Sequence, residues 1–341
     1  MNLEDFKKFV QGHFTDGLVI IIGSGLSAAE GISGMPSLAA HLMEASKSIV
    51  DTELLKSWEP LGAELAAKTG LEEALLRYPP TADLENWIMD QTCSLMLPEE
   101  RAVVQEVIEG RQLKLAQLLS KILAPSNGLS ILTTNYDRLA EIACERAGYH
   151  VDTTAVGLYA GEFDHSRSKF MSCRGVQSRG KSVSLKHAPR AIILKPHGSF
   201  DWYRNKGQVL RCGMELDLPR AIITPGLNKY KAGYASPFDI HRELANERVR
   251  SAAKLMVLGY GFNDDHLQTH LLERIESGLP TLIVTRGIGE TMNRLATESP
   301  NCVCVGESNS VQGVTVISKE GRSDHAGPSY WDLSVLVQEV L

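Results

Sequence analysis

Several features that would assign a protein quickly are missing from these 341 residues. The longest apolar run falls far short of the ~18 residues that a membrane-spanning helix needs. The opening segment, MNLEDFKKFVQGHF, carries acidic residues early and has no apolar core, so it does not read as a signal peptide. The sequence also contains no internal repeat and no low-complexity tract. We therefore expect a cytoplasmic protein with no membrane contact.

The sequence also has no excess of positive charge and no CxxC pair of cysteines. The chain has 35 basic and 41 acidic residues, a net charge of −6, so no general attraction to nucleic acid is expected. Its 6 cysteines are dispersed, and no CxxC pair occurs. Scattered cysteines in a long chain are typical of reduced thiols in the cytosol. We predict no metal site, and in particular no zinc.

The strongest positive pattern runs from Leu18 to Pro36. Five apolar residues, three of them consecutive isoleucines, lead into Gly23-Ser24-Gly25. An unbroken apolar run that ends in glycine is typical of a buried parallel strand. Glycines at that end let a ligand approach the backbone, and a helix that starts there offers N–H groups to phosphate. The pattern predicts a Rossmann-like, doubly wound α/β fold that holds a nucleotide.

The spacing Gly23-x-Gly25-x-x-Ala28 also fits the dinucleotide fingerprint of dehydrogenases. Those enzymes continue with a second strand that ends in an acidic residue roughly 20 positions later. Residues 37–44 are instead helical in character, and residues 31–36 insert a turn where the helix of a dehydrogenase would continue. These differences exclude a dehydrogenase.

A long helical block follows the glycine turn. Residues 38–124 are rich in Leu, Ala, Glu and Lys, with breaks expected near Asp51, Gly70, Pro79–Pro80 and Pro98. The block is too long for a simple crossover, so we predict a helical insertion that covers the nucleotide cleft. We expect residues 1–290 to form the catalytic domain. Residues 291–341 would add strands and a helix that pack on this domain or on a partner.

Residues 151–190 are rich in glycine and serine and are predicted to be an irregular loop. From residue 165 to residue 190 this loop carries seven lysines and arginines and no acidic residue. Such a run is usually a solvated surface. It is also a plausible contact for an acidic partner or for nucleic acid, so we expect it to matter for assembly or triggering rather than for bond cleavage.

Small or polar residues follow several short buried strands. Thr134 and Asn135 follow one strand, His197 follows another, and Gly259-Tyr260 follow a third. The carboxyl ends of parallel strands meet at one edge, so we expect these residues to converge. Asn135 and Asp137 could simply cap the next helix. His197 could be structural, but histidine also suits acid–base catalysis near neutral pH.

Four ordered blocks together resemble the sirtuin fold. They are Gly23-Ser-Gly-x-Ser27, Thr133-Thr-Asn-Tyr-Asp137, Pro196-His-Gly-Ser-Phe-Asp-Trp202 and Gly259-Tyr-Gly-Phe-Asn-Asp264. The chain looks most like the sirtuin-like (Sir2-type) NAD-cleaving effectors of bacterial antiphage defence, some of which work with a HerA-type ATPase. The resemblance covers most of residues 15–285. It implies NAD+ as the substrate, a homo-oligomer, and no direct sequence-specific binding to nucleic acid.

The resemblance also implies a role for individual residues. Asn135 and His197 would be catalytic: Asn135 orients water or a ribose hydroxyl, and His197 takes the proton. Asp137 would hold the nicotinamide carboxamide. The other residues implied in binding NAD+ are Gly23, Ser24, Gly25, Ser27, Pro36, Thr134, Gly259, Tyr260 and Asp264.

Two departures from the deacylating sirtuins bear on the acceptor. Those enzymes carry two CxxC pairs that hold zinc, whereas only Cys212 lies between His197 and Gly259 here. Their acidic and aromatic segment after the glycine turn is replaced by Gly31-Ile-Ser-Gly-Met-Pro36. Both changes favour water, which predicts an NAD+ glycohydrolase that releases nicotinamide and ADP-ribose. The alternatives are an NAD-dependent protein deacylase and a non-enzymatic sensor of NAD or ADP-ribose.

Overall fold

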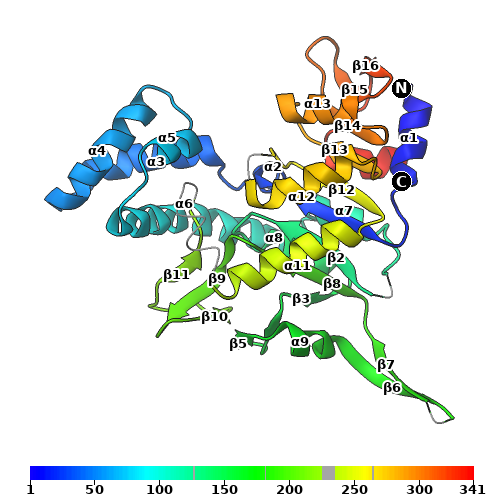
Figure 1. Cartoon of the computed structure of the whole chain (residues 1–341), viewed down its shortest axis with the longest axis horizontal. Helices are drawn as coiled ribbons and strands as arrows, with labels where there is room; N and C mark the ends of the chain where they lie inside the picture. The colour runs from blue at the N-terminus through cyan, green and yellow to red at the C-terminus, as the bar shows by residue number, and fades with distance from the viewer. Residues whose placement is uncertain (126, 181, 225–234, 263–264) are drawn as a thin grey trace.

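Two sheets and one separate hairpin make up the β-structure of the described residues (Figure 1). This computed structural model describes residues 1–125, 127–180, 182–224, 235–262 and 265–341. In them the larger sheet has nine strands, in the spatial order β16 (Gly321–Ala326), β15 (Gly313–Ser318), β14 (Cys302–Glu307), β13 (Thr281–Val284), β12 (Lys254–Leu258), β1 (Leu18–Ile22), β2 (Leu129–Thr133), β8 (Arg190–Leu194) and β3 (His150–Asp152).

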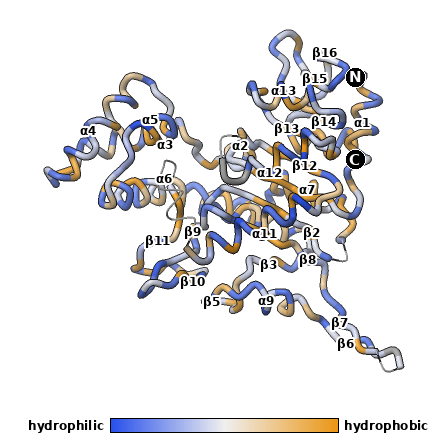
Figure 2. Tube along the Cα trace, viewed as in Figure 1, coloured by the Kyte–Doolittle hydropathy of each residue, from blue (hydrophilic) through white to orange (hydrophobic). Residues whose placement is uncertain are grey.

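The larger sheet is parallel from β14 to β3 and becomes antiparallel only at its β15–β16 edge. β1 lies between β12 and β2, and all five of its residues are buried. Ile20 and Ile22 point into one core, whereas Val19 and Ile21 point into the other. Figure 2 shows the hydrophobic residues concentrated along these central strands. The predicted doubly wound parallel sheet is confirmed.

Helices cover both faces of this sheet. The first core receives side chains from α1 (Leu3–Gln11), α3 (Met35–Ala45), α4 (Thr52–Ala66), α5 (Leu71–Arg77), α6 (Ala82–Ile108), α7 (Lys114–Leu119), α8 (Leu139–Arg146) and α14 (Leu333–Val340). The second core receives side chains from α11 (Phe238–Ser251), α12 (Asp265–Glu276) and α13 (Glu290–Glu298). The short helix α2 (Ser24–Ala28) starts directly after β1.

The stretch between β1 and β2 is helical, with a 3-10 turn η1 (Ser46–Ser48) after α3. Asp51 accepts hydrogen bonds from the first turn of α4, and Gly70 precedes α5, so chain breaks occur where expected. The break expected at Pro98 is wrong, because Pro98 lies inside α6. Its neighbours Met96, Leu97 and Glu100 are buried, so packing on both sides of the proline holds the helix together.

The prediction of an irregular loop over residues 151–190 is also wrong. Part of it joins a second sheet, in the order β11 (Arg220–Ile222), β9 (Gly198–Asn205), β10 (Gln208–Cys212), β5 (Ala160–Phe163) and β4 (Ala155–Val156). After α9 (His165–Ser168) and η2 (Lys169–Ser172), β6 (Cys173–Arg179) and β7 (Ser182–His187) form a hairpin that projects from the body (Figure 1). The strands escaped prediction because they are short and mostly exposed, so no buried alternation marks them in the sequence.

The C-terminal region is built into the larger sheet. β14 pairs with β13, and α14 packs against α1 and α7 of the same chain. The Gln11 Nε2 donates a hydrogen bond to the Val340 carbonyl over 2.8 Å. The apolar residues of α14 are thus buried within the chain itself.

Among the described residues, no helix is long and apolar enough to cross a membrane. The 6 cysteines are free, and Cys173 is the most exposed of them, whereas the others are buried.

Candidate active site

The polar residues at the strand ends converge on one cavity of about 150 Å³. It lies at the carboxyl ends of β1, β2, β8 and β12, the edge at which doubly wound sheets bind nucleotides. Seven of the residues singled out from the sequence line it: Ser24, Ser27, Thr134, Asn135, Asp137, His197 and Tyr260. Residues separated by more than 200 positions thus share one small space.

Asn135, Ser27 and Asp137 form a buried hydrogen-bond chain. Asn135 Nδ2 donates to Ser27 Oγ over 2.7 Å and to the Gly23 carbonyl over 2.9 Å. Ser27 Oγ in turn donates to Asp137 Oδ2 over 2.6 Å. Both amide hydrogens of Asn135 are therefore committed to protein, and the direction of its Oδ1 is fixed. An oxygen held in this way can accept a hydrogen bond from a water molecule or a sugar hydroxyl.

Asp137 has a structural task as well. Its Oδ1 accepts a hydrogen bond from the Leu139 N–H over 3.1 Å at the start of α8, so it partly fulfils the capping alternative. Burial raises the pKa of the Asp137 carboxyl, while the positive charge of Lys195 and the Ser27 hydrogen bond oppose the rise. The same carboxylate thus fixes the helix start and points an oxygen toward Ser27 at the cavity.

His197 reaches the same cavity from the turn after β8. Its side chain is 9% exposed. Its carbonyl accepts a hydrogen bond from the Ile223 N–H over 2.9 Å, and the Gly198 N–H donates to the Lys195 carbonyl over 3.0 Å. Gly198 has φ +84°, and a Cβ there would lie 2.2 Å from the Ala221 carbonyl oxygen, so the turn depends on glycine.

The glycines of the two turns pack on each other, which corrects the expectation that they leave room for a ligand. A Cβ at Gly23 would lie 2.4 Å from Tyr260 Cα, and one at Gly25 would lie 2.9 Å from Gly259 Cα. The Gly25 N–H already donates to the Gly259 carbonyl over 2.9 Å, so it is not open to phosphate. The glycines bring the ends of β1 and β12 together, and this contact sets the position of α2.

One other predicted residue, Pro36, lies elsewhere. Pro36 is exposed in the first turn of α3 and is not among the residues that line the cavity. Its neighbours Gly34 and Met35 occupy that place instead. Asp264 lies outside the described residues.

Sequence reasoning missed one wall of the cavity. This wall comes from the turn after α2 and from the helical insertion, and consists of Ile32, Ser33, Gly34, Met35, Glu72 and Met96. Ser33 is fixed there because its N–H and its Oγ donate to the two carboxylate oxygens of Glu99 over 2.7 and 2.6 Å. No local pattern identifies Glu72 or Met96, because only the packing of α5 and α6 brings them over the strand ends.

A second cavity, of about 460 Å³, lies on the other side of α2. Gly25, Gly259 and the chain after β13 line it, together with Arg286 and Trp331. The Arg286 guanidinium lies 5.5 Å from the centre of the Trp331 ring, and its Nε lies 2.9 Å from Glu307 Oε2. An aromatic ring with a cation on its face is a suitable surface for a flat, polar ring system.

Within the described part of the chain, no three His, Cys, Asp or Glu side chains are grouped as a metal ion would require.

Part of the chain is similar to a known domain family. Residues 129–287 match the family model of the SIR2-like domain. None of the curated proteins matches the sequence. A solved structure of Sir2Tm bound to a propionylated peptide is similar at 15% identity and a TM-score of 0.38, covering 85% of this chain and 89% of that one.

Two further solved structures have similar values. A complex of Sir2 with a p53 peptide and NAD+ has 15% identity and a TM-score of 0.36, covering 85% of this chain and 89% of the other. A structure on the basis of sirtuin substrate affinity has 15% identity and a TM-score of 0.39, covering 85% and 90%. Likeness at this level assigns no reaction. The chain therefore contains a region, residues 129–287, that is similar to the SIR2-like domain, within a doubly wound α/β fold.

Proposed function

We propose that this protein hydrolyses the bond between nicotinamide and ribose in NAD+, releasing nicotinamide and ADP-ribose. One observation carries the proposal. Asn135, whose amide hydrogens are both committed, and His197 line the same small cavity together with Asp137. This supplies a fixed acceptor for water, a base, and a carboxylate in one place.

The two cavities suit the two ends of the substrate. The nicotinamide ribose would occupy the first cavity, where Asp137 is available to the carboxamide. The adenosine would occupy the second cavity, against Arg286 and Trp331. Ser24 lines the first cavity and Gly25 the second, so the pyrophosphate would cross at the start of α2. The larger volume of the second cavity agrees with the larger adenosine half.

The residues then have defined roles in hydrolysis. The bond between the anomeric carbon and the nicotinamide nitrogen breaks, and its electron pair leaves with nicotinamide, which becomes neutral. The oxygen of water bonds to the anomeric carbon, positioned by Asn135 Oδ1. His197 takes the proton that this water loses and later returns it to solvent. Positioning of the water and a single base are enough for this hydrolysis, because nicotinamide leaves without gaining a proton.

Incubating the purified protein with NAD+ alone tests this proposal. We expect nicotinamide and ADP-ribose in equal amounts, measured by chromatography. A protein deacylase would produce little without an acyl-lysine peptide, and an NAD sensor would bind without any product. Product formation that strictly requires an acyl-lysine peptide, or binding with no turnover under any activating condition, would refute the proposal.

The cellular role belongs to the same proposal. The resemblance of the four sequence blocks to antiphage effectors supports NAD+ depletion as an antiphage response, triggered through assembly as a homo-oligomer or with a HerA-type ATPase. We expect NAD+ to fall in infected cells that carry the natural protein and its neighbouring genes, and to stay constant with His197→Ala. Light scattering tests the assembly: a fully active monomer at all concentrations would contradict control by oligomerisation.

A further inference from the structure

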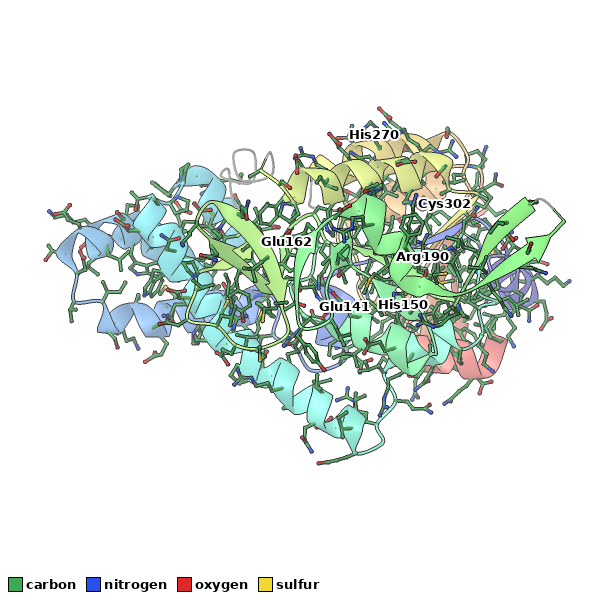
Figure 3. All side chains as sticks on the ribbon, turned by 90° about the horizontal axis from the view of Figure 1, so that it is seen from below. Glu141, His150, Glu162, Arg190, His270 and Cys302 are labelled. Carbon is green, nitrogen blue, oxygen red and sulfur yellow. The ribbon has the colours of Figure 1, made fainter. Side chains whose placement is uncertain are left out.

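Lys195, at the end of β8, places a charged ammonium group where almost no water reaches. Its side chain is 1% exposed. Nζ lies 3.0 Å from Glu141 Oε1 on α8, near the centre of the molecule in Figure 3. The same Nζ donates to the carbonyl of Asp137 and, over 3.5 Å, to the carbonyl of Tyr136. These two carbonyls belong to the turn that carries Asn135 and Asp137.

The backbone of Lys195 holds the other half of the site. Its carbonyl accepts the Gly198 N–H over 3.0 Å, which closes the turn that presents His197. Its N–H donates to His241 Nδ1 over 2.9 Å, and His241 Nε2 contacts Thr154 Oγ1 over 2.8 Å. One residue is therefore bonded to both turns of the site.

A buried ion pair is a weak source of stability, and an apolar pair of similar size often stabilises as much or more. Two neighbouring buried carboxylates have cationic partners of their own. Glu100 is paired with Arg138, and Asp201 Oδ2 lies 2.7 Å from Arg211 Nε. The Tyr136 carbonyl also accepts the Phe200 N–H over 2.9 Å and Ser199 Oγ over 3.2 Å. For the Asp137 carbonyl, Lys195 Nζ is the donor that the described residues provide.

We propose that Lys195 is a positioning residue, which ties the turn of Asn135 and Asp137 to the turn of His197 and so sets the geometry for bond cleavage. This inference rests on the proposed hydrolysis of NAD+. It assigns Lys195 no contact with the substrate, because its side chain lies beneath the turns and does not line the cavity.

Removing one or both charges of the pair tests the inference. Lys195→Met leaves Glu141 buried without its partner and should lower both the melting temperature and turnover. The double variant Lys195→Met/Glu141→Leu removes both charges of the pair and should recover part of the melting temperature. Its kcat should nevertheless stay about a hundredfold below wild type with little change in KM, because misplacement of about 1 Å costs this much. Recovery of kcat together with stability would overturn the proposal.

If the double variant does not fold, Glu141→Gln still tests the proposal. The glutamine oxygen still accepts from Lys195, and both carbonyls keep their donor, so kcat should remain within about threefold of wild type. A hundredfold loss in Glu141→Gln would show that the charge pair itself matters and would refute the positioning role.

Hydrogen exchange separates this inference from the proposed function. Amides of residues 133–140 should exchange at least tenfold faster in the double variant, while those of β12 should be unchanged. If the wild type releases no nicotinamide, the proposed function fails, and the exchange rates still decide the role of Lys195. Unchanged exchange at residues 133–140 would overturn it.

Discussion

The strand-end site and the β6–β7 hairpin differ in how far their side chains are buried. In the site, Lys195 and Asp137 are buried and bonded to other groups of the chain. On the hairpin, the side chains of Val176 and Val183 are each 66% exposed, and Lys186 is exposed beside them. Change in the site should therefore alter both chemistry and stability. In the isolated chain, change on the hairpin should leave the chemistry unaltered and should affect stability less than change in the site.

The largest expected effect comes from the two proposed catalytic residues. Asn135→Ala and His197→Ala should each lower nicotinamide release by about 10²- to 10⁴-fold, because the first removes the group that positions water and the second removes the base. NAD+ binding should persist, because the second cavity is untouched, and it is measured by calorimetry. Ser27→Ala should weaken binding instead, because Ser27 belongs to α2, at whose start the pyrophosphate would cross.

Circular dichroism and melting temperature serve as controls for these variants. If either variant folds correctly and still hydrolyses NAD+ at the parental rate in the activated state, our assignment of the site is wrong.

The next prediction compares two glycines that have nearly the same backbone conformation, one in the site and one on the hairpin. Gly259 has φ +58° and Gly180 has φ +60°, but a Cβ at Gly259 would lie 2.5 Å from the Leu26 nitrogen, whereas one at Gly180 meets nothing within 4 Å. Alanine in the left-handed region costs about 1–2 kcal/mol, and overpacking adds about 1–3 kcal/mol. Gly259→Ala should thus lower the free energy of unfolding by about 2–5 kcal/mol in denaturant titrations.

Gly180→Ala is the matched control and should cost about 2 kcal/mol at most. Equal losses in the two variants would show that the packing between the glycine turns contributes nothing.

A smaller effect should appear in the dependence of stability on pH. Burial and the charge of Lys195 lower the pKa of His241 to about 3. The unfolded chain, with a histidine pKa near 6.5, therefore binds the proton more readily, and stability falls as pH drops below about 6.5. His241→Gln keeps an acceptor and a donor but does not titrate. From pH 7 to pH 5.5 wild type should lose about 1 kcal/mol more than this variant.

Thermal melts of both proteins across that pH range measure the difference. Parallel curves would show that His241 is not neutral in the folded protein.

The smallest effect is expected on the hairpin. Reversing Arg174 and Lys186 to glutamate should leave nicotinamide release by the activated enzyme within about twofold, because both side chains are exposed and lie outside the cavity. The same assay at several salt concentrations checks the result. Loss of NAD+ binding in this variant would place the hairpin in the site and remove the contrast drawn above.

Much of the main sheet could be predicted because its strands are buried on both faces. The three consecutive isoleucines in β1 indicate this burial directly. The polar residues after β2 and β8 are easy to recognise because they follow buried apolar strands. The convergence of Asn135 and His197 then follows from the rule that parallel strands end at one edge.

The other parts of the fold and the site depend on contacts between distant residues, which no local sequence pattern indicates. Glu72 enters the cavity through the packing of α5, and β4, β5 and the strands of the hairpin are too short or too exposed to show a period. The role expected of the glycines failed for a related reason. A glycine that makes room for a ligand and one that makes room for another turn look the same in a sequence.

The contact between the glycine turns has a consequence for how this protein can evolve. A side chain gained in a packed core can often be offset by a smaller partner, but Gly23, Gly25 and Gly259 have no side chain to give up. A substitution at one of these positions therefore cannot be offset by a smaller residue at another. Random variation of the three codons followed by selection for folding should return glycine at all of them, whereas the positions around them diversify.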